Sequence, residues 1–334
     1  MGRVSVVIPT ASRPETLEIT LRAVSRQVSL DLVEEVIVSE NLSDRRSEVV
    51  CAKFPDLPIT YTFRDPVFGG PMAGFKHVAA LFGETRGELV AFACDDDVWS
   101  PGHIATAVES LDRHPEAAAH FSAFYAAESE LAHDAYQWGA PLLWLAAGRP
   151  ERFSEYVLGE AQMLALGWVF TPFHWSTLVA RTEHAVAVAP TMLETSHPFY
   201  ADRMLVLGLA ERGSLVFDPA VDTLYRVYAG NWQASQDPKL VSGLLSQGSD
   251  AVHSLAASKN IDLPALWRSY LADMPQEVIP EVNRWMVDRF TAKELDEFGL
   301  ATHLPPRRSA MDKVLGRLGR ACGALSGRNS QWPS

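Results

Sequence analysis

The sequence predicts an α/β fold, with a mostly parallel sheet flanked by helices and a mainly helical C-terminal extension. Two observations predict it. Over the first 125 residues, β-branched apolar runs alternate with segments of helical periodicity, and this alternation is typical of parallel βαβ units. The apolar runs are also continuous rather than broken at every second position, which indicates strands with both faces covered by helices.

Each element of this alternation has its own signal. The first strand is expected at 4–8, a mostly β-branched run, after which Leu17, Leu21 and Val24 share one helical face behind Pro14 in the first turn. By the same criteria, further strands are expected at 33–38, 59–63, 89–94 and 118–125, and further helices at 43–53, 71–84 and 101–113.

Beyond residue 125 the regular alternation is lost. Residues 126–175 are rich in aromatic side chains, which suit either a pocket wall or an aromatic core. A strand is expected at 176–181, a helix at 197–212 that ends at Gly213, and a pair of strands within 214–232. The chain is thus expected to consist of a main domain over 1–235, a helical extension over 236–304 and a basic amphipathic tail over 305–334.

Composition excludes some classes of function. The 334 residues include 29 basic and 41 acidic ones, a formal net charge of −12, whereas nucleic-acid binding needs a basic surface. The three cysteines form no CxxC pair, which suits a reducing cytoplasm. No apolar run reaches the roughly 18–20 residues of a membrane span, and the start lacks the apolar stretch of a signal peptide. We therefore expect a cytoplasmic protein.

The tail at 305–334 combines positive charge with an apolar helical face. This pattern suits contact with an anionic membrane surface, which would place the protein at the inner membrane face. Packing of the tail on the acidic body is the other interpretation of the same pattern. The oligomeric state has no signal in the sequence.

Three adjacent carboxylates, Asp95, Asp96 and Asp97, follow the apolar strand expected at 89–94. Like charges held together raise one another's pKa values unless a cation neutralises them. Because the carboxyl ends of parallel strands form the ligand-binding edge of such a sheet, a divalent ion with oxygen ligands is the simplest explanation. A solvated acidic turn or a helix N-terminus is the alternative that these residues alone leave open.

Five segments, taken in order, resemble family 2 glycosyltransferases, which have the GT-A fold with its Rossmann-like sheet. The segments are VSVVIPTASRPETLEITLRAVSRQ, EEVIVSENLSD, FGGPMAGFKHVAALFGETRGELVAFACDDDVWSP, HPFYADRMLVLGLAERG and LYRVYAGNW. They are similar to the family's nucleotide loop with its strand and helix, its second strand, its DXD segment, the helix with the catalytic base, and the loop over the phosphates. The resemblance covers about residues 3–232 and implies a nucleotide-binding half at 1–125 and an acceptor half at 126–235.

The resemblance also implies roles for single residues. Those expected to contact the nucleotide or its sugar are Pro9, Thr10, Arg13, Glu40, Asp65, Lys76, Asp95, Asp96 and Arg226. Those expected on the acceptor side are Trp99, His174 and Trp175. Asp97 would hold the divalent metal, Mn²⁺ or Mg²⁺, that bridges the diphosphate of the donor.

By the same resemblance, Asp202 would be the general base. It would take a proton from an acceptor hydroxyl as that oxygen attacks the anomeric carbon opposite the leaving nucleotide, which makes the transfer inverting. Two positions depart from the family pattern. Ala201 stands where a second acid is common, and Tyr228 stands where some relatives have a histidine on the metal.

The implied substrates are a nucleotide sugar and the hydroxyl of a small molecule or glycan precursor. Glu40 can accept the N3–H of uracil, which favours UDP, while dTDP and GDP offer similar donors. One alternative is a non-catalytic nucleotide-sugar-binding protein of the same fold, which the presence of Asp202 argues against. Another is a sugar nucleotidyltransferase, which would have a glycine-rich loop where this chain has IPTASRPETL.

Overall fold

The structure is a computed structural model. It describes residues 2–41, 45–70, 72–127, 136–137, 140–151, 154–171, 173–194, 198–226, 238–272, 274–275, 278–279, 282, 286 and 290–300. The tail at 305–334, with its expected membrane contact, and the position of Tyr228 lie outside these residues. No helix in the described ranges is long and apolar enough to cross a membrane.

The described strands form one sheet in the order β3-β2-β1-β4-β9-β6-β10-β5, with β7 on β6 and β8 on β10. Their bounds are β1 (Val4–Thr10), β2 (Val33–Glu40), β3 (Ile59–Phe63), β4 (Leu89–Phe92), β5 (Val98–Trp99), β6 (Ala117–Ala127), β7 (Tyr136–Gln137), β8 (Tyr156–Leu158), β9 (Val179–Arg181) and β10 (Ser214–Arg226).

The sheet is mostly parallel, as the sequence predicts. β3, β2, β1 and β4 run parallel to one another. β9 lies between β4 and β6 and runs antiparallel to both. β6 therefore runs in the same direction as β4, and so does β10, which is parallel to β6. The carboxyl ends of β1, β2 and β4 therefore meet at one edge of the sheet, where α/β proteins bind ligands.

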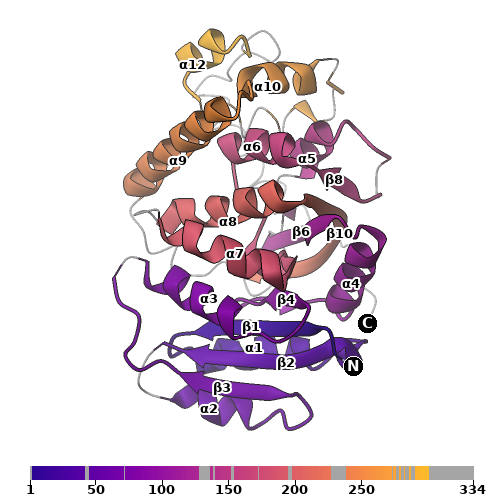
Figure 1. Ribbon diagram of the computed structural model, residues 1–334, viewed down its shortest axis with the longest axis vertical. Helices are drawn as coiled ribbons and strands as arrows, with labels where there is room; N and C mark the ends of the chain where they lie inside the picture. The colour runs from indigo at the N-terminus through magenta and orange to yellow at the C-terminus, as the bar shows by residue number, and fades with distance from the viewer. Residues whose placement is uncertain are drawn as a thin grey trace, which may run out of the picture.

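Helices cover both faces of this sheet (Figure 1). One face packs against α1 (Pro14–Val24), α2 (Arg46–Cys51) and α4 (His103–Arg113), and the other against α3 (Ala73–Glu84), α7 (Thr182–Leu193) and α8 (Pro198–Arg212). Successive strand residues enter opposite cores: Val6 and Ile8 pack with the first set of helices and Val7 with the second. Both faces of β1 are thus apolar, which is why its sequence is a continuous apolar run.

The remaining helices lie at the end of the molecule away from β3 (Figure 1). They are α5 (Ala140–Ala146), α6 (Glu160–Val169), α9 (Pro238–Ser258), α10 (Leu263–Leu271) and α12 (Ala292–Glu297). Trp267 of α10 is fully buried, and its indole N–H donates to the carbonyl oxygen of Ala165 in α6 at 2.9 Å. The helical C-terminal region therefore shares one hydrophobic core with the main domain.

Some boundaries differ from the sequence prediction. The strand pair expected within 214–232 is one long strand, β10, up to Arg226. Its register against β6 shifts between Asp218 and Val221, where the Asp218 carboxylate accepts the N–H of Ala220 at 2.8 Å. A bulge therefore takes the place of the expected turn at this proline-containing stretch. The strand expected at 176–181 begins only at Val179, after the 3₁₀ helix η2 (Trp175–Thr177).

Candidate active site

The three aspartates lie at the carboxyl edge of the sheet. Pairing of β4 with β1 continues to Ala93, whose N–H donates to Val7, and the chain then turns with a hydrogen bond from the Asp97 N–H to the Cys94 carbonyl at 3.3 Å. Asp95, Asp96 and Asp97 are only 1%, 4% and 1% exposed. This burial rules out the alternative of a solvated acidic turn.

Arg13, which follows β1, pairs with the first two aspartates. Its guanidinium nitrogens lie 2.8 Å from Oδ1 of Asp95 and 2.8 Å from Oδ2 of Asp96. Thr10 at the end of β1 donates its hydroxyl to Oδ2 of Asp95 at 2.6 Å. Burial raises the pKa of Asp95 to about 6, while the charge of Arg13 acts in the opposite direction. Four residues predicted to bind the donor are thus brought together in space.

Asp97 is held by three backbone or hydroxyl donors. The hydroxyl of Ser176 donates to Oδ2 at 2.6 Å, and the backbone N–H of Arg226 donates to Oδ1 at 3.2 Å. Thr20 of α1 donates to the Asp97 carbonyl oxygen at 2.9 Å. Burial, followed by the nearby Asp96 carboxylate, nevertheless holds the pKa of Asp97 well above its ordinary value. A cation beside Asp97 would relieve both effects.

The pairing of β9 explains why η2 meets the aspartates. Because β9 runs antiparallel to β4, the residues that precede β9 lie beside the residues that follow β4, and the Phe92 N–H donates to the Leu178 carbonyl at 3.2 Å. Ser176 in η2 consequently accepts the Cys94 N–H at 2.9 Å while it donates to Asp97. Neither Ser176 nor Cys94 was predicted as a site residue.

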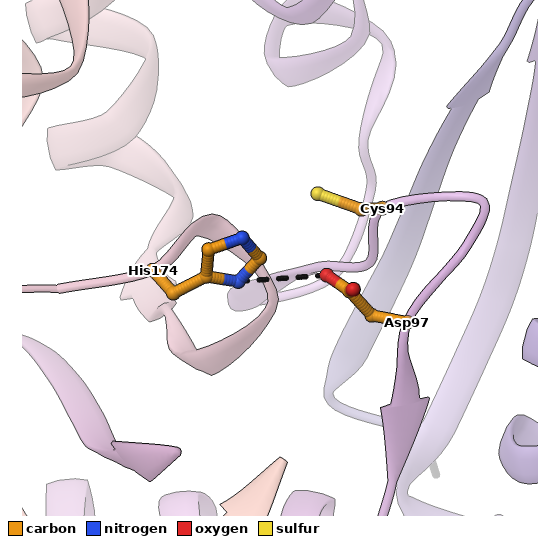
Figure 2. Close-up of side chains that lie close together, drawn as sticks. All are labelled: Cys94, Asp97 and His174. Carbon is orange, nitrogen blue, oxygen red and sulfur yellow. Dashed lines mark ion pairs between the residues drawn. The ribbon is translucent and has the colours of Figure 1, made fainter. Parts of the chain in front are cut away.

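His174 caps η2 and faces Asp97 (Figure 2). Its Nδ1 lies 3.4 Å from Oδ2 of Asp97, and its ring packs against Tyr225 and Phe124 with centroid distances of 4.2 and 5.2 Å. Burial lowers the pKa of His174 to about 3, so the imidazole is neutral at neutral pH. Cys94, Asp97 and His174 form a group whose donor atoms all lie within 4.8 Å of one another.

Asp202 lies in α8, near Trp175, the first residue of η2. Burial raises the pKa of Asp202 to about 6, against the smaller opposing effects of a backbone hydrogen bond, the charge of Arg203 and, least of all, the Trp175 side chain. Oδ1 of Asp202 is buried and has no hydrogen-bond partner within the described part of the chain. The Trp175 ring is fixed among Phe92, Phe75 and Phe173, at centroid distances of 4.8, 6.1 and 5.9 Å.

The other residues predicted to contact the nucleotide differ in how deeply their side chains are buried. Glu40 ends β2 and is fully buried, accepting from the Tyr61 hydroxyl at 2.6 Å and from the Ser12 N–H at 3.2 Å. Pro9 is half-buried at the end of β1, whereas Asp65 and Lys76 are exposed on the loop after β3 and on α3. Arg226 is the last residue of β10, and its backbone reaches Asp97.

Trp99, predicted on the acceptor side, lies in the core next to η2. Its ring is 5% exposed, stacks on His103 at a centroid distance of 4.3 Å and donates its N–H to the Ser176 carbonyl at 2.6 Å. Trp99 therefore supports η2 from the core.

Comparisons with known proteins bear on the family and the fold. The model of the family described as glycosyl transferase family 2 matches residues 5–156. The structure of TarS 1–349 of S. aureus in complex with UDP-GlcNAc is similar to this chain, with 13% sequence identity and a TM-score of 0.51. The match covers 89% of this chain and 92% of the TarS chain. Mannosyltransferase PcManGT from Pyrobaculum calidifontis, in complex with GDP-Man and Mn²⁺, is 16% identical, with a TM-score of 0.50 and coverages of 90% and 84%. No curated protein gives a significant match. The likenesses confirm the predicted fold.

Proposed function

We propose that this chain, whose residues 5–156 match the model of glycosyl transferase family 2, transfers a sugar from a nucleotide diphosphate to an acceptor hydroxyl with inversion. One observation carries the finer proposal. Three consecutive residues at η2 lie near the two acids of the site: His174 and Ser176 face Asp97, and the Trp175 side chain is close enough to Asp202 to lower its pKa slightly. A single short turn thus lies beside both the donor-side acid and the base-side acid.

The donor would lie over the carboxyl ends of β1 and β4. Thr10 and Arg13 orient the Asp95 carboxylate there. This carboxylate would bind the ribose or the sugar of the donor. Asp97 fits a divalent ion, because burial and the neighbouring Asp96 carboxylate raise its pKa and a cation would relieve both effects. Such an ion supplies charge neutralisation as the nucleotide diphosphate departs.

Asp202 would hold the acceptor proton. A carboxylate with a pKa of about 6 is ionised at neutral pH and is more basic than an exposed aspartate, which suits a general base. Its Oδ1 is buried and has no partner within the described ranges, so an acceptor hydroxyl would donate to that atom once the side chains over it move aside.

We propose UDP as the first candidate for the donor nucleotide and Mn²⁺ or Mg²⁺ as candidate ions. UDP-GlcNAc and GDP-Man with Mn²⁺ are bound in the two relatives of similar fold. Glu40 is buried beneath Tyr61 and Ser12, so its contact with a base requires the loop at 11–13 to move, and Ser12 with a φ of 60° stands in that loop. Base recognition then depends on these three residues together.

Two variants and a control test the proposal. Donor turnover and product mass are measured over a panel of UDP, dTDP and GDP sugars with Mn²⁺, and nucleotide binding is measured by thermal shift. Asp202→Asn should keep nucleotide binding and lose turnover, whereas Asp97→Asn should lose metal-dependent nucleotide binding. Asp112→Asn, an exposed acid at 54%, should change neither. Wild-type turnover by Asp202→Asn would refute the assignment of the base.

A non-catalytic binding protein makes a different prediction. It would bind the nucleotide sugar, and no donor of the panel would be hydrolysed or transferred under any metal. A nucleotidyltransferase would instead release pyrophosphate from a nucleoside triphosphate and a sugar 1-phosphate. Both outcomes are read in the same assay by product mass.

A further inference from the structure

A histidine–aspartate pair is buried beside the short strand β5. Nδ1 of His103, the first residue of α4, lies 2.9 Å from Oδ2 of Asp222 in β10. The two side chains are 0% and 11% exposed. Ser122 of β6 donates its hydroxyl to Oδ1 of Asp222. The pair thus joins the start of α4 to two neighbouring strands of the sheet.

The hydrogen bond within this pair has a defined direction. Burial opposes ionisation of Asp222, but the charge of His103 and the hydrogen bonds from His103 and Ser122 outweigh it and lower the pKa of Asp222. The carboxylate is therefore the acceptor, and Nδ1 of His103 is the donor. Nε2 of His103 is buried and has no hydrogen-bond partner within the described part of the chain. Because an apolar pair of similar size would avoid the buried charge and the unpartnered nitrogen, stability alone does not explain these residues.

We propose that His103 and Asp222 are positioning residues for the donor site, which orient the Asp97 carboxylate without touching it. The inference rests on the proposed function, in which Asp97 serves the metal-dependent binding of the nucleotide. Asp97 accepts a hydrogen bond on each carboxylate oxygen, from the Ser176 hydroxyl on Oδ2 and from the Arg226 N–H on Oδ1. The contacts of the buried pair lead to both of these donors.

The first connection passes through Trp99. The His103 ring stacks on the Trp99 ring with a centroid distance of 4.3 Å and an interplanar angle of 20°. The Trp99 indole N–H donates to the Ser176 carbonyl oxygen at 2.6 Å, and the Ser176 hydroxyl donates to Asp97 at 2.6 Å. A shift of the His103 ring would therefore move Trp99 and, through Ser176, the hydrogen-bond donor to Oδ2 of Asp97.

The second connection is the backbone of β10. The Ser100 N–H donates to the Asp222 carbonyl oxygen at 2.7 Å, and the next two residues of β10 pair with β5. Further along the same strand, the Arg226 N–H reaches Oδ1 of Asp97 at 3.2 Å. Since the hydrogen bond from His103 to Asp222 holds β10 against the start of α4, it also sets where the Arg226 N–H meets Asp97.

Calorimetric titration of the full chain with UDP, once with Mn²⁺ and once with EDTA, tests the inference. The readout is the factor by which Mn²⁺ tightens UDP binding, because this factor reports the metal site and not the rest of the nucleotide contacts. Loss of a direct partner of a metal ligand typically costs about 10–100-fold in metal affinity. The pair acts one contact further out, so Asp222→Asn and His103→Phe should each reduce the factor about tenfold and leave UDP binding in EDTA unchanged.

Two further variants separate positioning from stability. Glu35→Gln is the matched control, because Glu35 is 3% exposed and pairs with Arg86 near the amino end of β2, at the edge of the sheet opposite the donor. It should lower the melting temperature and leave the Mn²⁺ factor unchanged. The double variant His103→Phe with Asp222→Leu should melt at a higher temperature than His103→Phe alone, because no buried carboxylate is left without its cation. Its Mn²⁺ factor should stay low.

Three results of this titration would overturn the inference. They are an unchanged Mn²⁺ factor in Asp222→Asn, a loss of equal size in Glu35→Gln, and a factor restored together with the melting temperature in the double variant. The last result would show a pair that only stabilises the fold.

A nucleotide-free readout separates the inference from the proposed function. The Trp99 indole N–H, identified in ¹H–¹⁵N spectra by its absence in Trp99→Phe, should exchange faster with solvent in Asp222→Asn but not in Glu35→Gln. An unchanged Trp99 signal in Asp222→Asn would refute the positioning role whether or not UDP binds. A wild-type protein that does not bind UDP with Mn²⁺, but whose Trp99 signal depends on Asp222, supports the connection to Ser176 and counts against the proposed function.

Discussion

Replacing the proposed base, Asp202→Asn, should make the protein more stable while it abolishes transfer. The carboxylate is largely buried in α8, and Oδ1 has no partner within the described ranges. Burial raises the pKa of Asp202 from 3.8 to about 6, against the opposing effects of Arg203 and Trp175. The folded state therefore disfavours the ionised form, and an asparagine removes that cost.

The magnitude follows from the difference in pKa between the folded and unfolded chains. One pKa unit corresponds to about 1.4 kcal/mol, so the ionised Asp202 costs about 3 kcal/mol of folding free energy at pH 8. An amide N–H at the position of Oδ1 lacks an acceptor and takes back about 1 kcal/mol or more. The expected gain in the free energy of unfolding is about 1–2 kcal/mol at pH 8.

The sign of the pH dependence provides the check. Above pH 6, Asp202 is ionised in both states and its cost is fully present. As the pH falls from about 6 to 3.8, the folded protein takes up the proton before the unfolded chain does, and the advantage of the variant disappears. Urea unfolding of both proteins between pH 8 and pH 4 measures this difference. A constant difference across that range would refute the reasoning.

Transfer by the same pair of proteins tests the chemistry separately. The wild-type kcat/KM should rise with pH through about 6 and then level off, because the base must be ionised. Asp202→Asn should lose about 10²–10⁴-fold in rate. A variant that is more stable and equally active would show a buried acid with no part in proton transfer.

Three further perturbations follow from buried charge and packing. Arg13→Ala leaves Asp95 and Asp96 without their cation and should lower the free energy of unfolding by about 1–3 kcal/mol. The loss is smaller than for a fully buried pair because the Arg13 side chain is 38% exposed. Urea unfolding measures the loss, and Arg13→Lys should recover part of it. Burial lowers the pKa of His120 from 6.5 to about 4. The stability that the neutral imidazole contributes is therefore present above pH 6.5 and is lost as the pH falls toward 4. In thermal unfolding between these pH values, His120→Phe should lose less stability than the wild-type protein. Trp267→Ala should cost about 3–5 kcal/mol and lower the melting temperature in calorimetry, since Trp267 is fully buried between the extension and the main domain.

The sequence predicted the strands of the sheet because its helix-covered strands are apolar on both faces. Val6, Val7 and Ile8 enter two different cores, and that requirement is visible without a structure. It also predicted where the acids lie, because Asp95 to Asp97 directly follow such a strand. Local patterns of this kind need no knowledge of which strand lies beside which.

What the sequence did not predict depends on one long-range pairing. β9 is a three-residue antiparallel strand between β4 and β6, and this insertion alone brings His174 to Ser176 beside Cys94 to Asp97. The two segments are about 80 residues apart, and neither contains a periodic signal for the other. The burial of Trp99 could not be predicted for the same reason, since it depends on the pairing of β5 with β10.

The same pairing places one short turn beside both acids of the site. Ser176 and Trp175 are neighbours in this three-residue turn; the Ser176 hydroxyl donates to Asp97, and the Trp175 side chain lies near Asp202. Both carboxylates are held at raised pKa values in a core that would be more stable with neutral side chains in their places. Stability alone does not account for two buried acids beside one turn. We propose that they serve chemistry that needs a cation at one of them and a proton acceptor at the other.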